Sequence, residues 1–230
     1  RMVWRPRQRQ QRLGFGYPST PPLSMSAPSR LAPSRLAAAD LWAMSEAMKH
    51  ETVLITGAGQ RLGRAMALAV AARGHGVALH YNASATAAEA LADDIRRTGG
   101  KAATLQADLS DPAAVAGLLP AATQALGPVT ILVNNASAFA NDSVEGMTTD
   151  GWRRHMAVNA EAPVFLAQAF AAVLPAECDG LIVNMLDEAV LRPGPTFFSY
   201  TVSKAALATA TEMLAQALAP RVRVNGIAPG

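Results

Sequence analysis

A tyrosine, a lysine and an aspartate stand close together near the C-terminal end of the sequence. Tyr200 and Lys204 are four residues apart, so a helix would place the phenol and the ammonium on one face. A phenol titrates near pH ~10 in isolation, and an adjacent cation lowers that pKa. Asp187 stands thirteen residues before Tyr200 and adds a carboxylate, which only accepts hydrogen bonds. This pattern indicates proton transfer to a bound substrate.

Alternating apolar and helical segments predict the sheet that must position these side chains. Short apolar runs predict strands at 52–56, 76–81, 102–107, 130–135, 180–185 and 221–227, and Ala-rich segments predict helices at 61–74, 85–99, 111–126, 152–174 and 200–218. Strand and helix in repeated succession indicate a parallel sheet with helices on both faces. Right-handed crossovers then give a doubly wound, Rossmann-like α/β fold in a single domain.

Composition limits the classes of partner. Half of the 230 residues are apolar, which suits one domain with a full core, and no apolar run reaches the ~18 residues of a membrane span. Cys178 is the only cysteine, so a reducing, cytoplasmic compartment is expected. The four histidines lack ligand spacing, so no metal site is expected. Residues 44–230 carry 13 basic and 16 acidic residues, a net charge of −3, so neither nucleic acid nor a membrane is an expected partner.

The chain termini carry separate expectations. Residues 1–47 are rich in Arg, Pro and Ser and are predicted to form a disordered tail. That tail is either translated sequence upstream of a start at Met44 or Met48, which we favour, or a transit peptide. Residues 48–230 form the predicted domain. Because the chain begins at Arg1 and stops at Gly230, we expect a C-terminally truncated domain that lacks its substrate lid and last strand.

A glycine-rich turn follows the first predicted strand. The stretch from Thr56 to Gly63 reads TGAGQRLG and leads directly into a helix. Such a turn lets backbone amides approach a pyrophosphate at a helix N-terminus. The second strand ends in HYNAS, without the acid that would accept a bond from a ribose 2′-OH. Since a carboxylate would repel a 2′-phosphate, this sequence favours NADP(H), with His80, Tyr81, Asn82, Ser84 and Arg61 nearby.

From these motifs onward the sequence resembles the short-chain dehydrogenase/reductase family over residues 51–230. The turn matches T-G-x-x-x-G-x-G except that Arg61 replaces the middle glycine, and Ser137 departs from an N-N-A-G motif at Asn134-Asn135-Ala136. Asp108-Leu109 resembles the adenine-contacting pair, and Asn225-Gly226-x-x-Pro229-Gly230 the motif beside the nicotinamide. Asn159 resembles the asparagine that bends a helix and holds a water in the proton relay. The resemblance implies that Lys204 also holds the ribose.

Three residues resemble the pteridine reductase branch of that family in particular. Arg61 belongs to the motif T-G-A-x-x-R-L-G. In that branch the arginine reaches the cofactor phosphates and the substrate ring; the alternative is a tolerated surface arginine. Phe139 belongs to the motif N-A-S-x-F. In that branch the phenylalanine stacks on a flat pterin; the alternative is a phenylalanine of the core. Asp187 stands where carbonyl reductases have a serine, and an ionised carboxylate would repel a carbonyl oxygen but suit ring N–H donors. The alternative for Asp187 is a structural role in a degenerate enzyme.

The resemblance thus implies an NADPH-dependent pteridine reductase of tetrahydrobiopterin or folate metabolism, acting on a dihydropterin, dihydromonapterin or dihydrofolate as a cytoplasmic homotetramer. A 3-oxoacyl-type carbonyl reductase and a catalytically dead NADP-binding sensor are the alternatives. The expected catalytic residues are Asp187, Tyr200, Lys204 and Asn159. The expected substrate residues are Arg61, Ser137, Phe139, Asp187 and Tyr200. The expected cofactor residues are Gly57, Arg61, Leu62, Gly63, His80, Tyr81, Asn82, Ser84, Asp108, Leu109, Asn135, Ala136, Ser137, Tyr200, Lys204, Pro229 and Gly230.

Overall fold

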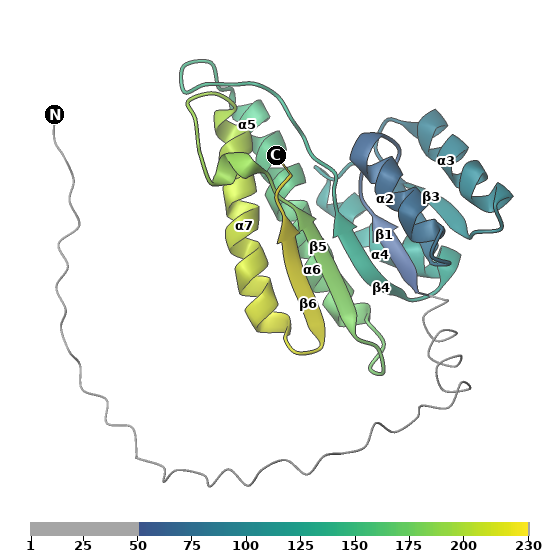
Figure 1. Cartoon of the computed structure of the whole chain (residues 1–230). Coiled ribbons are helices and arrows are strands. Elements are labelled where there is room, and N and C mark those ends of the chain that lie inside the picture. The colour runs from purple at the N-terminus through teal and green to yellow at the C-terminus, as the bar shows by residue number, and fades with distance from the viewer. Residues whose placement is uncertain (1–50, 230) are drawn as a thin grey trace, which may run out of the picture. The chain divides into compact units, whose positions relative to one another are not determined.

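Six parallel strands form one sheet in the order β3-β2-β1-β4-β5-β6 (Figure 1). The computed structural model describes residues 51–229, so the predicted tail at 1–47 and the terminal Gly230 lie outside it. The strands are β1 (Thr52–Ile55), β2 (Gly76–Tyr81), β3 (Ala102–Gln106), β4 (Val129–Asn134), β5 (Gly180–Met185) and β6 (Val222–Ile227). This order confirms the doubly wound prediction and places the topological switch point between β1 and β4.

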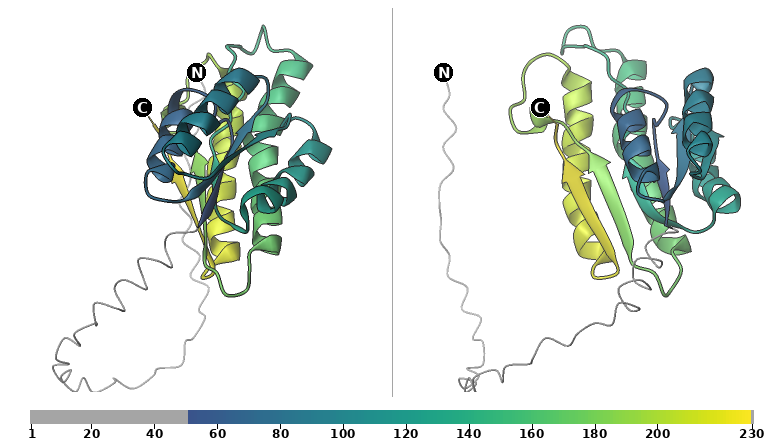
Figure 2. Two further views of the ribbon diagram at one scale, coloured as in Figure 1. Left: turned by 90° about the vertical axis from the view of Figure 1, so that its right-hand side faces the viewer. Right: turned by 45° about the vertical axis from the view of Figure 1, so that its right-hand side comes forward.

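Helices cover the sheet in two layers (Figure 2). On one face lie α2 (Arg61–Ala71) and α3 (Ala85–Arg97), and their core contains the buried Leu79, Leu91 and Ile95. On the other face lie α4 (Pro112–Leu126), α5 (Thr149–Met156), α6 (Ala162–Val173) and α7 (Phe198–Leu218), around a core that includes Leu132 and Phe170. The continuous burial of β1 follows from this double cover, because both faces of that strand meet helices. At β6, by contrast, buried Val222 and Val224 alternate with exposed residues.

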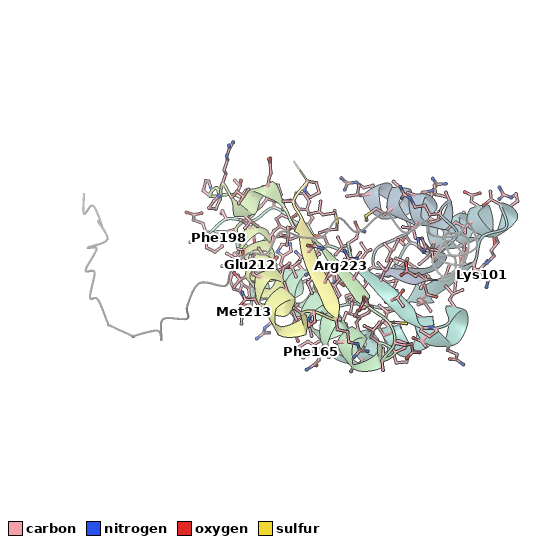
Figure 3. All side chains as sticks on the ribbon, turned by 60° about the horizontal axis from the view of Figure 1, so that its bottom comes forward. Lys101, Phe165, Phe198, Glu212, Met213 and Arg223 are labelled. Carbon is pink, nitrogen blue, oxygen red and sulfur yellow. The ribbon has the colours of Figure 1, made fainter. Side chains whose placement is uncertain are left out.

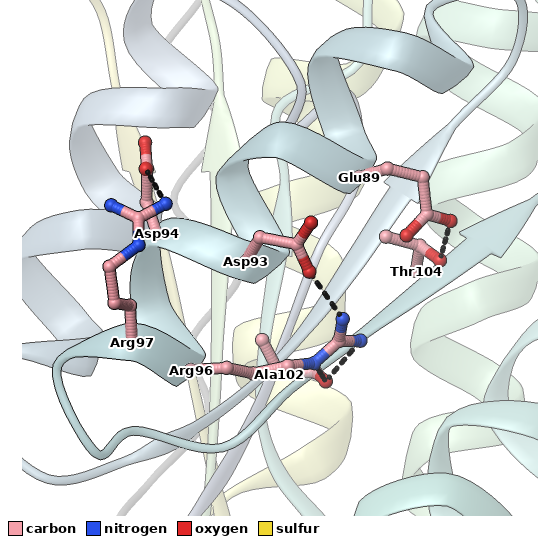
Figure 4. Close-up of polar contacts among 7 residues, drawn as sticks. All are labelled: Glu89, Asp93, Asp94, Arg96, Arg97, Ala102 and Thr104. Atoms are coloured by element: carbon pink, nitrogen blue, oxygen red, sulfur yellow. Dashed lines mark hydrogen bonds and ion pairs between the residues drawn. The ribbon is translucent and has the colours of Figure 1, made fainter.

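Polar contacts fasten α3 to the outer strands (Figure 4). The Arg96 guanidinium donates to the Ala102 carbonyl at 3.1 and 2.9 Å, and to the Asp93 carboxylate at 3.1 Å. Further along the helix, the Thr104 hydroxyl donates to Glu89 at 2.6 Å. Exposed pairs of this kind each contribute only ~0.2–1 kcal/mol. The contacts to Ala102 and Thr104 fix α3 beside β3, whose carboxyl end borders the candidate site.

The predicted strands are confirmed, with ends that differ by one residue at most. The predicted helix at 152–174 begins earlier, at Thr149, and is divided by a π-helical turn, η2 (Ala157–Glu161). A short 3-10 helix, η3 (Glu188–Val190), was not predicted; it follows Asp187, whose carboxylate accepts a bond from the Ala189 amide at 2.8 Å. Three residues are too few for a hydrophobic period, so only the capping aspartate signals this element.

The run from α5 to α6 is unusually long and apolar. Within residues 51–229, Thr149–Val173 is long and apolar enough to cross a membrane by length and composition alone. The run comprises α5, η2 and α6, and it packs against α4 and α7. Leu166 and Phe170 of this run are fully buried and belong to the core of this fold, whereas Phe165 is half exposed.

Candidate active site

The glycine-rich turn lies at the carboxyl edge of the sheet, beside the switch point. Gly57 has a φ of +64°, which favours glycine, and Gly63 leaves no room for a side chain, because a Cβ there would lie 2.2 Å from the Gly57 carbonyl oxygen. The Asn135 side-chain amide donates to the carbonyls of Thr56 and Gly57 at 2.9 and 3.1 Å, and the Asn135 backbone N–H donates to the Thr56 hydroxyl at 2.9 Å. These bonds join the end of β4 to the turn after β1.

A cleft of about 460 Å³ opens above this turn, on the carboxyl side of the strands. Its lining contains most of the residues predicted to bind the cofactor: Gly57, Arg61, Leu62, Gly63, His80, Asn82, Ser84, Asp108, Leu109, Asn135, Ala136 and Ser137. It also contains Gln60, Ala83, Ala138, Arg154 and Val158, which the sequence did not indicate. Tyr81 and Pro229 do not line this cleft and Gly230 lies outside the described residues, so their roles stay predictions. Tyr200 and Lys204 also lie outside this lining.

Arg61 and Arg154 supply the positive charge of the cleft, and Asp108 is the one acid among its lining residues. Arg61 has a φ of +48°, the left-handed region that costs a non-glycine residue ~1–2 kcal/mol. This left-handed backbone explains why the family motif has a glycine at this position. Arg61 takes the place of that glycine with strain in its backbone. Asp108 is held by Ser110, whose backbone N–H and hydroxyl donate at 2.9 and 2.7 Å and lower the pKa of the carboxyl.

His80 holds the glycine turn from below. Its Nδ1 accepts from the Gly57 amide at 3.0 Å, and its Nε2 donates to the Ala107 carbonyl at 3.1 Å. The ring is 1% exposed, and burial lowers its pKa, so the neutral tautomer that this geometry needs is favoured. Both nitrogens thus have backbone partners. No ring nitrogen is therefore free to bond to a nucleotide, although His80 lines the cleft, and its role in binding the cofactor stays a prediction.

Replacing His80, the hydrogen-bond partner of the Gly57 amide, should destabilise the protein. His80→Leu leaves a buried N–H and a buried carbonyl without their partners, so we expect a loss of ~1–3 kcal/mol in the free energy of unfolding. His80→Asn keeps an acceptor near the Nδ1 position and should lose less than His80→Leu. Urea denaturation followed by circular dichroism measures both. Equal losses in the two variants would show that the bond to Gly57 is not the cause.

Tyr200 and Asp187 form a hydrogen-bonded pair between α7 and the segment after β5. The Tyr200 hydroxyl donates to the Asp187 carboxylate at 2.6 Å, and Tyr200 is only 6% exposed. Burial raises the pKa of Tyr200, and the hydrogen bond and negative charge of Asp187 raise it further. The expectation that a neighbouring cation lowers this pKa is therefore wrong for this structure. Tyr200 is held as a neutral donor.

Lys204 lies one turn further along α7 and is almost fully buried. Its ammonium donates to the Met185 carbonyl at 2.7 Å and lies 5.9 Å from the centre of the Tyr200 ring. Burial lowers the pKa of Lys204 to about 8, and the Asp187 carboxylate offsets part of that shift. The predicted face shared by Tyr200 and Lys204 is confirmed, since both side chains point from α7 toward the end of β5.

A smaller cavity of about 330 Å³ lies in front of the Tyr200–Asp187 pair. Phe139 lines it and is 63% exposed, so the alternative of a core phenylalanine is wrong. The Phe139 ring stacks on Phe197 with centroids 4.8 Å apart and meets the edge of Tyr200 at the same distance. The complete lining is Phe139, Asp187, Ala189, Arg192, Gly194, Thr196, Phe197, Tyr200 and Thr201.

Asn159 lies in the π-turn η2, which interrupts the α-helical run where the bend was predicted. Its side-chain oxygen accepts from the Ala138 amide at 2.8 Å and from the Ser137 hydroxyl at 3.2 Å. Its amide group donates to the Ala138 carbonyl at 2.9 Å and to the Ser203 hydroxyl at 3.0 Å. These bonds use both protons of the amide and fix the Ser137 segment against α7. A role of Asn159 in holding a relay water stays a prediction.

A second polar network, which the sequence did not reveal, supports the start of α7. Asp142 accepts from the backbone N–H of Ser199 at 3.1 Å and from its hydroxyl. Ser199 in turn contacts Nδ1 of His155 at 2.6 Å, and the other ring nitrogen of His155 accepts from the Ala140 amide at 3.2 Å. The network binds the Phe139–Asp142 segment to the residue before Tyr200. Among residues 51–229, no cluster of three or more His, Cys, Asp or Glu side chains has the arrangement of a metal site.

Comparison with known proteins places this geometry in a family. The solved structure of FolM alternative dihydrofolate reductase 1 from Brucella canis, complexed with NADP, is 47% identical with a TM-score of 0.76, over 78% of this chain and 73% of that one. The angucycline C-6 ketoreductase LanV with bound NADP is 35% identical with a TM-score of 0.73, over 78% and 72%. Pteridine reductase 1 of Leishmania tarentolae is 36% identical over 216 residues, which cover 77% of this chain and 75% of that protein. Residues 51–230 match the short chain dehydrogenase family, so the chain is a member of that family of oxidoreductases.

Proposed function

We propose that the protein is an NADPH-dependent reductase of a dihydropterin. The observation that carries this proposal is the Asp187 carboxylate, which holds the Tyr200 hydroxyl at 2.6 Å beside a cavity with an exposed phenylalanine ring. A carboxylate in that position favours a flat substrate with N–H donors over a carbonyl substrate. The likeness to an alternative dihydrofolate reductase and to a pteridine reductase supports the same choice.

The larger cleft fits a dinucleotide phosphate. The glycine turn gives phosphates access to backbone amides, and Arg61 and Arg154 line the same space with positive charge. Asn82 and Ser84, rather than an acid, stand after β2, where a 2′-phosphate would lie. The two solved relatives described above contain NADP. When bound, NADPH supplies the hydride for the reduction.

The protein's own groups would then bind and protonate the substrate. The Asp187 carboxylate already accepts from Tyr200 and Ala189, yet it keeps lone pairs for ring N–H or amino donors. Phe139 offers a flat apolar face to the ring. The Tyr200 hydroxyl delivers a proton to the ring nitrogen of the reduced C=N bond, and the phenolate that remains regains a proton from solvent. The Lys204 ammonium, 5.9 Å from the Tyr200 ring, offsets the charge of that phenolate.

A carbonyl reductase is the second candidate, because LanV is a ketoreductase and shares 35% of aligned residues with this chain. A binding protein without catalysis is less well supported, since Tyr200 and Lys204 keep the geometry of a proton donor with a buried cation. Steady-state oxidation of NADPH distinguishes these functions. We expect turnover with 7,8-dihydrobiopterin or 7,8-dihydrofolate, little turnover with a quinone or diketone, and a clear preference for NADPH over NADH. Turnover of the carbonyl compounds alone would reject the pterin proposal.

We also infer a homotetramer. An apolar groove of about 310 Å³ runs between α4 and α6, where Phe165 is 50% exposed, and Met213 on α7 is 65% exposed (Figure 3). Exposed apolar side chains on neighbouring helices are typical of subunit contacts. Sedimentation velocity should show a tetramer for the native protein and a smaller species for Phe165→Asp. A native monomer would contradict the inference.

A further inference from the structure

Arg192 lines the same cavity as the Tyr200–Asp187 pair. Of the described residues around that cavity, Arg192 is the one with a positive charge, and no ion pair involves it. Glu188 precedes it by four residues and is exposed, yet the two side chains form no salt bridge. The guanidinium is thus available to a ligand in the cavity.

The two charged groups of this cavity differ in how they are held. Asp187 is bound on one side by Tyr200 and on the other by the Ala189 amide, so its carboxylate has a fixed direction. Arg192 is exposed and belongs to the segment that joins η3 to α7. In that segment Pro193 and Pro195 flank Gly194, and the proline rings restrict the backbone on either side. The inner end of the cavity therefore accepts hydrogen-bond donors, and its open rim carries donors and a positive charge.

The size of the cavity decides which part of a substrate reaches Arg192. A volume of about 330 Å³ is near the lower limit of ligand pockets, ~300–1,000 Å³. A bicyclic ring placed against Phe139 and Asp187 occupies the inner part, so a long substituent on that ring must pass toward the exposed rim. An arginine there matches a carboxylate well, because the planar guanidinium offers paired N–H donors.

We propose that Arg192 binds an anionic tail on the substrate, so that the preferred substrate class is a dihydropterin with a carboxylate-bearing substituent, such as dihydrofolate. This inference rests on the proposed pterin reductase function and extends it to the part of the substrate that does not react. Arg192 is then a specificity residue that acts on binding of the tail, with no part in proton transfer.

The test compares two substrates that share the reacting ring. Dihydrobiopterin has a short neutral side chain, whereas dihydrofolate carries a glutamate with two carboxylates. For Arg192→Gln, we expect kcat/KM for dihydrofolate to fall about three- to fivefold, mainly through KM, because an exposed charge-assisted contact is lost. The values for dihydrobiopterin should stay within twofold. Arg192→Lys keeps the charge without the paired donors and should give an intermediate loss with dihydrofolate.

Two controls separate this effect from general electrostatics. Arg73→Gln removes an exposed arginine just before β2, at the opposite edge of the sheet, and should leave both substrates unchanged. Added salt should raise the KM of the native protein for dihydrofolate and not for dihydrobiopterin, since it screens an exposed contact. A native protein that reduces dihydrobiopterin but gains nothing from the tail, or an Arg192→Gln variant that affects both substrates equally, overturns the assignment of Arg192. A native protein that reduces neither pterin rejects the proposed function itself and the inference with it.

Discussion

Tyr200→Phe should reduce dihydropterin-dependent oxidation of NADPH by about 10²- to 10⁴-fold, the usual contribution of a positioned general acid. The variant loses one hydroxyl and keeps the ring, whose edge contacts Phe139 at a centroid distance of 4.8 Å. The cleft proposed for the nucleotide does not include Tyr200, so NADPH binding should change only a few-fold. The loss should therefore appear in kcat more than in the affinity for the cofactor.

Fluorescence titration of NADPH and steady-state assays measure the two quantities separately. A control is Thr104→Val, which removes a hydroxyl from a residue of β3 that lines neither cavity. It should retain nearly native activity. If Tyr200→Phe keeps more than about a tenth of native turnover, a different group supplies the proton.

The fold was predictable because its signals are local. β1 and β4 are largely apolar runs. Such a run can be recognised as a buried strand from its own residues, without knowing which strands lie beside it. The turn from Gly57 to Gly63 was predictable for the same reason, since two of its glycines meet backbone restrictions that no other residue satisfies. The two cavities accordingly contain most of the residues that the motifs indicated.

The roles of His80 and Asn159 were not predictable, because they depend on contacts between distant segments. His80 joins β2 to the turn after β1 and to the residue after β3. These contacts form only where the folded sheet places the three strands side by side. The Asn159 side chain bonds to Ala138 and Ser203, which are distant in the sequence. Arg154 and Arg192 belong to no motif, and only the folded chain brings them to the cavities.

The pKa of Tyr200 shows the limit of reasoning from one helix. The spacing of Tyr200 and Lys204 is a property of α7, and it suggests a phenol whose pKa falls beside a cation. Asp187 comes from the segment after β5 and reverses that expectation, since its carboxylate lies 2.6 Å from the hydroxyl while the ammonium points to the Met185 carbonyl. Burial of the ring acts in the same direction as Asp187.

Asp187→Ser should lower kcat/KM for a dihydropterin by about 30- to 1000-fold, which corresponds to ~2–4 kcal/mol for a charge-assisted bond made in the transition state. Binding of NADPH should be nearly unchanged, because Asp187 lines the small cavity and not the nucleotide cleft. The serine hydroxyl would be a donor beside Tyr200, so a weak reduction of an activated diketone should appear. The pKa of Tyr200 should fall, since the variant removes both the hydrogen bond and the charge that raise it.

Asp187 also caps η3 through the Ala189 amide, so a structural explanation of any loss has to be tested separately. Serine and asparagine both cap well, and Asp187→Asn keeps the shape of the side chain without its charge. If the carboxylate serves chemistry, Asp187→Asn should lose about as much pterin turnover as Asp187→Ser, while both variants keep native thermal unfolding. If turnover in Asp187→Asn stays within a few-fold of the native protein, then shape and capping suffice. The choice of a pterin over a carbonyl substrate would then lose its physical basis, because that choice depends on a negative charge facing the ring.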